Sequence, residues 1–286
     1  MNKTTEGWGS GLLGVIIFSG SLPATRVAVG DFSPLFLTSA RAVIAACLGA
    51  VLLLALRQKR PLAGDLLPLA IVAAGVVVGF PLLTALALQH ITAAHSIVFI
   101  GLLPLATAMF GVWRAGERPK PAFWIFSVMG ALAVAGFAFT QNSDVSLIGD
   151  ALMVLAVLLC GLGYAEGAAL SRRLGGWQVI SWALLLALPI MAVLTLVSLP
   201  GTWSGVSVPA WASLAYVSVF SMLVGFVFWY RGLALGGITG VSQLQLLQPF
   251  FGLLLAGLLL GEAVPLSMIA VTVLVVACVI GAKRFA

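Results

Sequence analysis

Residues 231–265 read RGLALGGITGVSQLQLLQPFFGLLLAGLLLGEAVP, and this stretch decides the fold. It holds a glycine-rich entry, a long uncharged run with one proline, and Gly261-Glu262 at its end. A weaker copy, LALQHITAAHSIVFIGLLPLATAMFGVWRAGERPKP, covers residues 86–121. Pro104 falls on Pro249, and Gly116-Glu117 falls on Gly261-Glu262, at a constant offset of 145 residues. This shared spacing predicts that the chain is a duplicated unit.

The composition places that unit in a membrane. The chain is 62% hydrophobic and 8% charged, with a mean hydropathy of +1.19, whereas about a quarter of the residues of soluble domains are charged. We therefore expect an all-α integral membrane protein. The sequence has no GxSxG, HExxH or Walker loop, and its three cysteines lack metal-ligand spacing. We expect no enzymatic activity, no cofactor and no bound metal.

The number of spans follows from the length of the apolar stretches, since a spanning helix needs about 20 such residues. We expect ten transmembrane helices, divided into two five-helix repeats over residues 1–140 and 141–286. The expected spans are residues 8–28, 32–56, 66–88, 93–113, 121–140, 149–171, 177–199, 209–230, 238–260 and 264–282.

The basic residues predict the orientation, because cytoplasmic loops are enriched in Lys and Arg. With a cytoplasmic N-terminus, the outer loops hold only Arg26. Both termini are then cytoplasmic, and the second repeat is inverted relative to the first. This topology explains the net charge of +6, so we expect the lipid bilayer as a partner and no nucleic acid. The inner basic residues are Lys3, Arg57, Lys59, Arg60, Arg114, Arg118, Lys120, Arg172, Arg173, Arg231, Lys283 and Arg284.

Five prolines fall inside expected spans. An internal proline frees a backbone carbonyl and bends the helix, which a bilayer tolerates only where other helices or a cavity satisfy the backbone. We expect these residues to be hinges or cavity walls: Pro23, Pro81, Pro104, Pro189 and Pro249.

The two halves resemble EamA-type units of the drug/metabolite transporter superfamily. The resemblance is carried by the runs from Pro104 to Glu117 and from Pro249 to Glu262, by Arg41, and by Tyr164 with Arg172-Arg173. It implies two inverted five-helix repeats with the fifth and tenth helices at the periphery. It also implies a multi-pass protein of the bacterial inner membrane, similar to exporters of amino acids and related metabolites.

Two charged residues inside expected spans have open roles. Small multidrug members of the superfamily carry a glutamate in their first helix, where this chain has Ser19 and Ser21. Glu166 is the acid well inside a span, and it either carries protons or pairs with Arg173, two helical turns further on. Arg41 either attracts a substrate carboxylate or, as we favour here, bonds to helix carbonyls or to an acid and fixes packing.

The expected substrate site is neutral and partly aromatic. Such a cavity suits small zwitterions with apolar or aromatic side chains, so the sequence and the resemblance together predict an exporter of neutral, hydrophobic and aromatic amino acids that works by alternating access. The alternative is efflux of lipophilic drugs or cations. One chain contains both repeats, so we expect a monomer to be functional. The residues expected to bind substrate are Ser19, Phe80, Thr84, His95, Phe99, Tyr164, Trp182, Gln245 and Gln248.

Overall fold

The structure is a computed structural model that describes residues 3–87, 90–91, 99–141, 146–260 and 266–286. Every regular element in these ranges is a helix. In chain order they are α1 (Lys3–Ser19), α2 (Ser21–Ala28), α3 (Pro34–Ala55), α4 (Ala63–Val72), η1 (Ala73–Gly79), α5 (Phe80–Ala87), α7 (Leu103–Ala115), α8 (Pro121–Gln141), α9 (Leu147–Leu174), α10 (Gly176–Val197), α11 (Val208–Tyr216), η2 (Val217–Val224), α12 (Gly225–Gly236), α13 (Ile238–Ser242), η3 (Gln243–Leu247), α14 (Gln248–Leu260) and α15 (Leu266–Phe285).

Six helical segments among the described residues are long and apolar enough to cross a membrane. A shorter apolar helix covers Pro121–Phe137. These segments agree with the expected class of all-α membrane protein. The six are Lys3–Thr25, Pro34–Ala55, Ala63–Ala87, Leu147–Leu174, Gly176–Val197 and Val208–Gly236.

Two of these segments contain a π-helical stretch at corresponding places. The segment formed by α4, η1 and α5 is π-helical over Ala73–Gly79, just before Pro81. The segment formed by α11, η2 and α12 is π-helical over Val217–Val224. A proline cannot donate to the carbonyl four residues earlier, and wider π turns are one way in which a helix accommodates that loss. Pro81 thus lies just after an irregular stretch of helix.

Pro104 and Pro249 differ from the expectation. Each is the second residue of a helix, Pro104 in α7 and Pro249 in α14. A missing N–H costs little in the first turn of a helix, so neither proline interrupts a continuous helix. The irregular backbone instead precedes them, as a turn at residues 101–102 and as the 3₁₀ helix η3.

The remaining two prolines of the expected set behave differently from each other. Pro23 lies in α2, which is separated from α1 at Gly20. The hydroxyl of Tyr216 donates to the carbonyl of Ile17 at 2.8 Å in the last turn of α1. Pro189, by contrast, is exposed and lies within α10, which continues past it as an unbroken helix. The structure therefore shows a break near Pro23 and none at Pro189.

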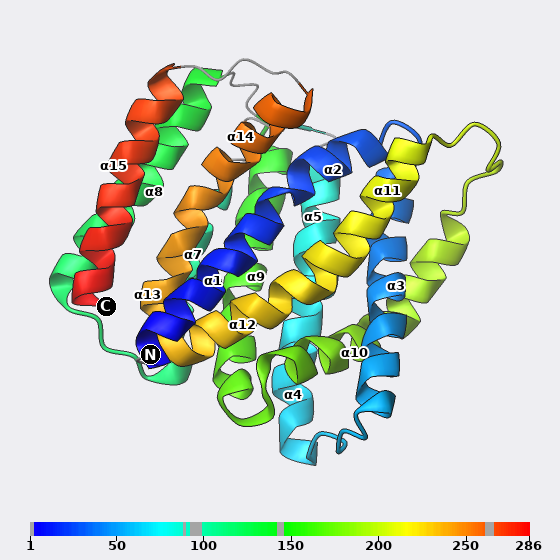
Figure 1. The fold of residues 1–286 in the computed structure, drawn as a ribbon, viewed down its shortest axis with the longest axis horizontal. Helices are drawn as coiled ribbons and strands as arrows, with labels where there is room; N and C mark the ends of the chain where they lie inside the picture. Colours follow the sequence, from blue (N-terminus) through cyan, green and yellow to red (C-terminus); the bar gives the residue numbers. More distant parts are fainter. Residues whose placement is uncertain (1–2, 88–89, 92–98, 142–145, 261–265) are drawn as a thin grey trace.

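Glycines allow two pairs of helices to pack with their backbones in contact. Gly7 and Gly11 of α1 face Gly236 and Gly232 of α12, and a Cβ added at Gly232 would lie 2.6 Å from the Cα of Gly11. Likewise, a Cβ at Gly75 of η1 would overlap the carbonyl of Leu159 on α9. Small residues at such crossings permit close van der Waals packing in membranes. Figure 1 shows α1 and α12 side by side along the bundle.

Both chain termini lie at one end of the bundle, which we call the basic end (Figure 1). Contacts between distant segments define it: the Lys120 N–H donates to the carbonyl of Phe285 at 2.9 Å, and Lys283 lies over the ring of Trp8 at 4.6 Å. Ion pairs to Glu6 and Glu117 lie there as well. The basic residues that we expect to be cytoplasmic therefore gather around the same end.

The opposite end is tied by a different contact. Asp31, in the loop before α3, accepts hydrogen bonds from the hydroxyl and the N–H of Ser207 at 2.6 and 2.8 Å. These two bonds lower the pKa of the Asp31 carboxyl below its usual value. The loops before α3 and before α11 are thus held together.

Candidate substrate site and ion-paired end

Tyr164 on α9 lies at the middle of a buried group of aromatic and polar side chains. The Phe226 and Trp229 rings of α12 lie 6.0 and 5.6 Å from its ring. Its hydroxyl neighbours Cys160 and Gln245. We call these five residues, Cys160, Tyr164, Phe226, Trp229 and Gln245, the Tyr164 centre. It brings together two of the residues expected from the sequence, Tyr164 and Gln245.

Two polar atoms of this centre have no hydrogen-bond partner among the described residues. They are Oε1 of Gln245, a side chain that is 2% exposed, and Nε1 of the fully buried Trp229. A buried polar atom without a partner is costly, and most such atoms in native proteins have one. One is an acceptor and the other a donor, so a small molecule with both kinds of group could satisfy them.

Arg41 on α3 lies within electrostatic range of Tyr164. Its Nε is buried, and the described residues provide no hydrogen bond or ion pair to its guanidinium. The sequence favours a partner among helix carbonyls or acids for Arg41, and the described residues provide none.

The other residues expected to bind substrate differ in their burial and in their hydrogen-bond partners. Ser19 is buried, but its hydroxyl donates to the Val15 carbonyl of its own helix at 2.7 Å. Thr84 has a buried hydroxyl without a partner among the described residues. Phe80 and Phe99 are partly buried and pack against the same hydrophobic core as Tyr164. Gln248 is partly buried at the start of α14, and His95 lies outside the described residues.

Trp182 lies elsewhere. It lines a pocket of about 240 Å³ with Arg60 and Pro61, which belong to the loop between α3 and α4. That loop carries basic residues of the basic end, so Trp182 contributes to a different cavity from the one we expected.

Glu166 is paired, but with a different arginine from the one expected. Its carboxylate forms an ion pair with the Nε of Arg114, near the end of α7. Arg173 instead binds Asp65 of α4. The Glu166 side chain is 6% exposed and that of Arg114 is 38% exposed. The pair therefore joins a buried acid on α9 to a partly hydrated base on α7.

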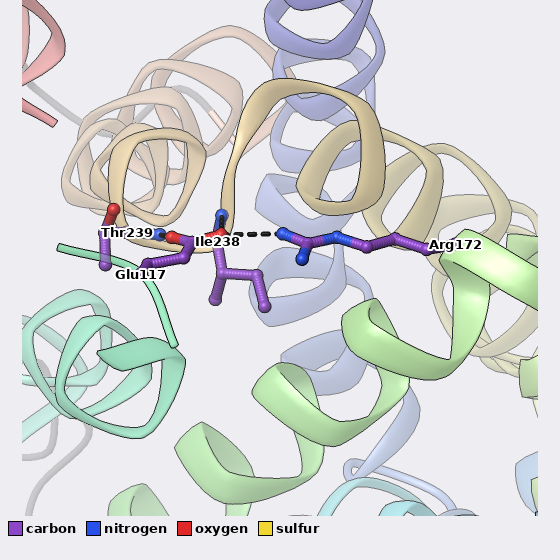
Figure 2. Close-up of polar contacts among 4 residues, drawn as sticks. All are labelled: Glu117, Arg172, Ile238 and Thr239. Carbon is purple, nitrogen blue, oxygen red and sulfur yellow. Dashed lines mark hydrogen bonds and ion pairs between the residues drawn. The ribbon is translucent and has the colours of Figure 1, made fainter. Parts of the chain in front are cut away.

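Glu117 links three elements at the basic end, as Figure 2 shows. Its Oε1 accepts from Arg172 at 2.7 Å and from the Ile238 N–H at 2.8 Å, and its Oε2 accepts from the Thr239 N–H at 2.8 Å. The carboxylate thus satisfies N–H groups in the first turn of α13 while it pairs with the last turn of α9.

Gly116 places Glu117 in that position. It ends α7 in a left-handed conformation, with φ of 68°, which glycine adopts without a Cβ penalty. Gly116 is therefore the residue at which α7 stops. Its counterpart in the second half, Gly261-Glu262, lies outside the described residues.

A pocket of about 350 Å³ opens beside Glu117 at the basic end. Trp8, Arg118, Thr239 and Lys283 are among the residues that line it. Ion pairs therefore surround a polar recess at this end.

Sequence reasoning did not select Trp229. The available signal was the spacing of Phe226, Trp229 and Tyr230, which places three aromatic rings on one helical face. All three are buried, and the hydroxyl of Tyr230 donates to the Gly163 carbonyl of α9 at 3.3 Å. The aromatic stripe of α12 is therefore the surface on which Tyr164 packs.

The fold is shared with a protein of known crystal structure. That chain superposes with a TM-score of 0.83 over 99% of this chain and 98% of its own length, at 18% identity. At this identity the likeness describes the fold alone.

Sequence relatives are transporters by name. The uncharacterized transporter YdeK of Bacillus subtilis is 65% identical over the full length of both chains. A probable terminal-alkyne amino-acid exporter of Streptantibioticus cattleyicolor is 25% identical over 89% of this chain and 85% of its own. The pseudopaline exporter CntI of Pseudomonas aeruginosa is 29% identical over 54% of each chain.

The model of the EamA-like transporter family matches residues 7–139 and again residues 147–282. Together the two matches cover nearly the whole chain, including the Tyr164 centre and the ion pairs of Glu117 and Glu166. The protein is a membrane transporter that belongs to the EamA-like transporter family.

Proposed function

We propose that the protein exports neutral, hydrophobic and aromatic amino acids and related metabolites by alternating access. The observation that carries this proposal is the Tyr164 centre. It combines aromatic rings with an amide oxygen and an indole N–H that have no hydrogen-bond partner among the described residues. Binding sites that are mostly apolar with a few placed polar groups suit small molecules that have an apolar side chain and a polar head.

The names of two relatives support export and, more weakly, this substrate class. One is a probable terminal-alkyne amino-acid exporter and the other is a pseudopaline exporter. Both are distant from this chain, so the class of amino acid rests on the chemistry of the Tyr164 centre.

Alternating access follows from two inverted repeats of five helices each, which we propose for residues 1–140 and 141–286. Features recur at or within one residue of the offset expected from the sequence: η1 and η2 begin at Ala73 and Val217, and α7 and α14 begin at Leu103 and Gln248. The direction reverses between the halves. The first helix, α1, starts at the basic end, while its counterpart α9 ends there with Arg172 and Arg173.

We further propose that the basic end faces the cytoplasm of a bacterial cell, in line with the positive-inside rule. In the described conformation Glu117 ties the loop that follows α7 to α9 and α13 at this end. An exporter must admit its substrate from the cytoplasm. These contacts would therefore separate in each transport cycle.

The geometry disfavours efflux of lipophilic cations. That alternative needs a carboxylate free to bind the cation, and the acid on which it depended, Glu166, is already paired with Arg114. The Tyr164 centre itself contains no acid.

Uptake into proteoliposomes that contain only this protein tests the proposal. A panel of labelled amino acids and one lipophilic cation should be offered with and without a pH gradient. We expect saturable movement of several neutral amino acids, suppressed by excess unlabelled substrate. Movement of the cation alone would contradict the proposal and favour the alternative.

A further inference from the structure

Arg41 is a partly buried cation for which the described residues provide no counterion. It is the eighth residue of α3, which begins at Pro34, so it lies about 10 Å along the helix at a rise of 1.5 Å per residue. Its Nε is buried and unbonded. A charge at such a depth is expensive and is normally paired.

The acids that the structure describes are all engaged elsewhere. Asp31 binds Ser207, and Asp150 has an interaction of its own. None of the described acids is therefore left to neutralise Arg41. The remaining four form ion pairs: Glu6 with Arg231, Asp65 with Arg173, Glu117 with Arg172, and Glu166 with Arg114.

Arg41 lies near other polar groups that have no hydrogen-bond partner among the described residues. Tyr164 is a titratable side chain within its electrostatic range, and Tyr164 in turn contacts Gln245 and Trp229. The region thus holds a guanidinium, an indole N–H and an amide oxygen without partners among the described residues. Two of these groups donate to an anion, and the amide oxygen accepts from an ammonium group.

We propose that Arg41 binds the carboxylate of the transported amino acid. This inference rests on the proposed function and narrows it to substrates that carry a carboxylate. The guanidinium fork matches a carboxylate with two parallel hydrogen bonds, which a lysine cannot reproduce. The Oε1 of Gln245 accepts from the substrate ammonium, and the rings of Phe226 and Trp229 contact its apolar side chain.

The test compares three probes that share one side chain: phenylalanine, phenylalaninamide and 2-phenylethylamine. Proteoliposomes with the wild-type protein should transport phenylalanine in clear preference to the two compounds without a carboxylate. In Arg41→Met we expect the apparent affinity for phenylalanine to fall about ten- to a hundredfold, the range of a lost charge-assisted hydrogen bond. Transport of the amine should change less than twofold, so the preference for the carboxylate disappears.

Two further variants make the result specific. Arg57→Met removes an arginine from the exposed loop that follows the same helix, and it should keep the wild-type preference. Arg41→Lys keeps the charge and loses the fork, so it should retain a preference weakened several-fold. It also serves as the test if Arg41→Met does not fold.

The outcomes separate this inference from the proposed function. If Arg41→Met, or Arg41→Lys in its place, keeps the full wild-type preference for phenylalanine over the amine, Arg41 does not bind the carboxylate, although amino-acid export stands. If the wild-type protein transports the amine as well as phenylalanine, the inference also fails. If it transports none of the amino acids of the panel, both the proposed function and the role of Arg41 are wrong.

Discussion

At the scale of single residues, the pair formed by Glu166 and Arg114 gives the clearest energetic expectation. The two side chains differ in burial, because Glu166 is almost enclosed while Arg114 is partly hydrated. Removing one partner of a pair leaves the other uncompensated, and the cost grows with the burial of the residue that remains. The effects of the two truncations should therefore differ.

We predict that Arg114→Gln destabilises the protein more than Glu166→Gln does. The first leaves a buried carboxylate unpaired and should cost about 3 kcal/mol, whereas the second leaves a base that water can reach and should cost about 1 kcal/mol. Thermal unfolding of the purified variants measures both. The double variant should recover part of the loss of Arg114→Gln; equal losses in the two single variants would contradict the assignment of the pair.

The same pair predicts the effect of Glu166 on coupling. Because its carboxylate is held by Arg114, Glu166→Gln should leave any dependence of amino-acid transport on a pH gradient unchanged. Parallel uptake assays of wild-type and variant proteoliposomes at matched protein content measure this. Loss of the pH dependence in the variant would restore Glu166 as a proton carrier.

At the scale of elements, the crossing of α1 and α12 depends on the absence of side chains. A Cβ added at Gly7 would overlap the backbone nitrogen of Gly236, while one at Gly9, two residues along the same helix, would meet nothing within 4 Å. A backbone clash cannot be relieved by turning a side chain, so the two helices would have to separate.

Gly7→Ala should therefore lower the unfolding free energy by about 1–3 kcal/mol. Gly9→Ala makes the same chemical change at an exposed position and should be neutral or slightly stabilising, since alanine favours the helix. Thermal unfolding and size-exclusion chromatography of the two variants measure this difference in stability. Equal behaviour of the two would mean that α1 and α12 do not cross at Gly7.

Six of the ten expected spans correspond to described helical segments that are long and apolar enough to cross a membrane, because apolar length and glycine or proline stops are local signals. The helix stop at Gly116 is one example. The irregular backbone was less predictable, since no residue signals that Val217–Val224 forms π turns or that the segment before Gln248 narrows to a 3₁₀ helix.

Partners across the bundle were predicted least well. One of the two interpretations of the sequence was an ion pair between Glu166 and Arg173 on the same helix, but Glu166 pairs with Arg114 on another helix. Tyr164 and Gln245 were selected from the sequence because polar groups in apolar spans are conspicuous. Trp229 was missed because an indole is not conspicuous there. Its role depends on which helix it faces.

At the scale of the whole molecule, Glu117 joins the two halves of the chain. It comes from the first half and binds Arg172 and the start of α13 in the second. Weakening these contacts should favour the conformation that is open at the basic end.

We predict that Glu117→Gln increases amide hydrogen exchange in η3, a segment that Glu117 does not itself contact. Loss of the charge weakens hydrogen bonds worth about 1.5–3 kcal/mol each. Hydrogen–deuterium exchange with mass spectrometry of the purified protein measures the effect. Glu6→Gln is the matched control, because its pair with Arg231 is solvent-exposed and such pairs contribute little. Unchanged exchange in η3 would show that Glu117 only caps α13.

The position of Cys160 offers a native chemical label for hydration of the interior. Its thiol is buried beside Tyr164, while Cys47 is exposed on the outside of α3 and Cys278 is buried in α15. A water-soluble maleimide reacts with Cys160 only when water reaches the Tyr164 centre. Once Cys47 has been replaced by serine, the alkylation rate of Cys160 therefore reports how often the centre opens, and substrates that occupy it should slow the reaction.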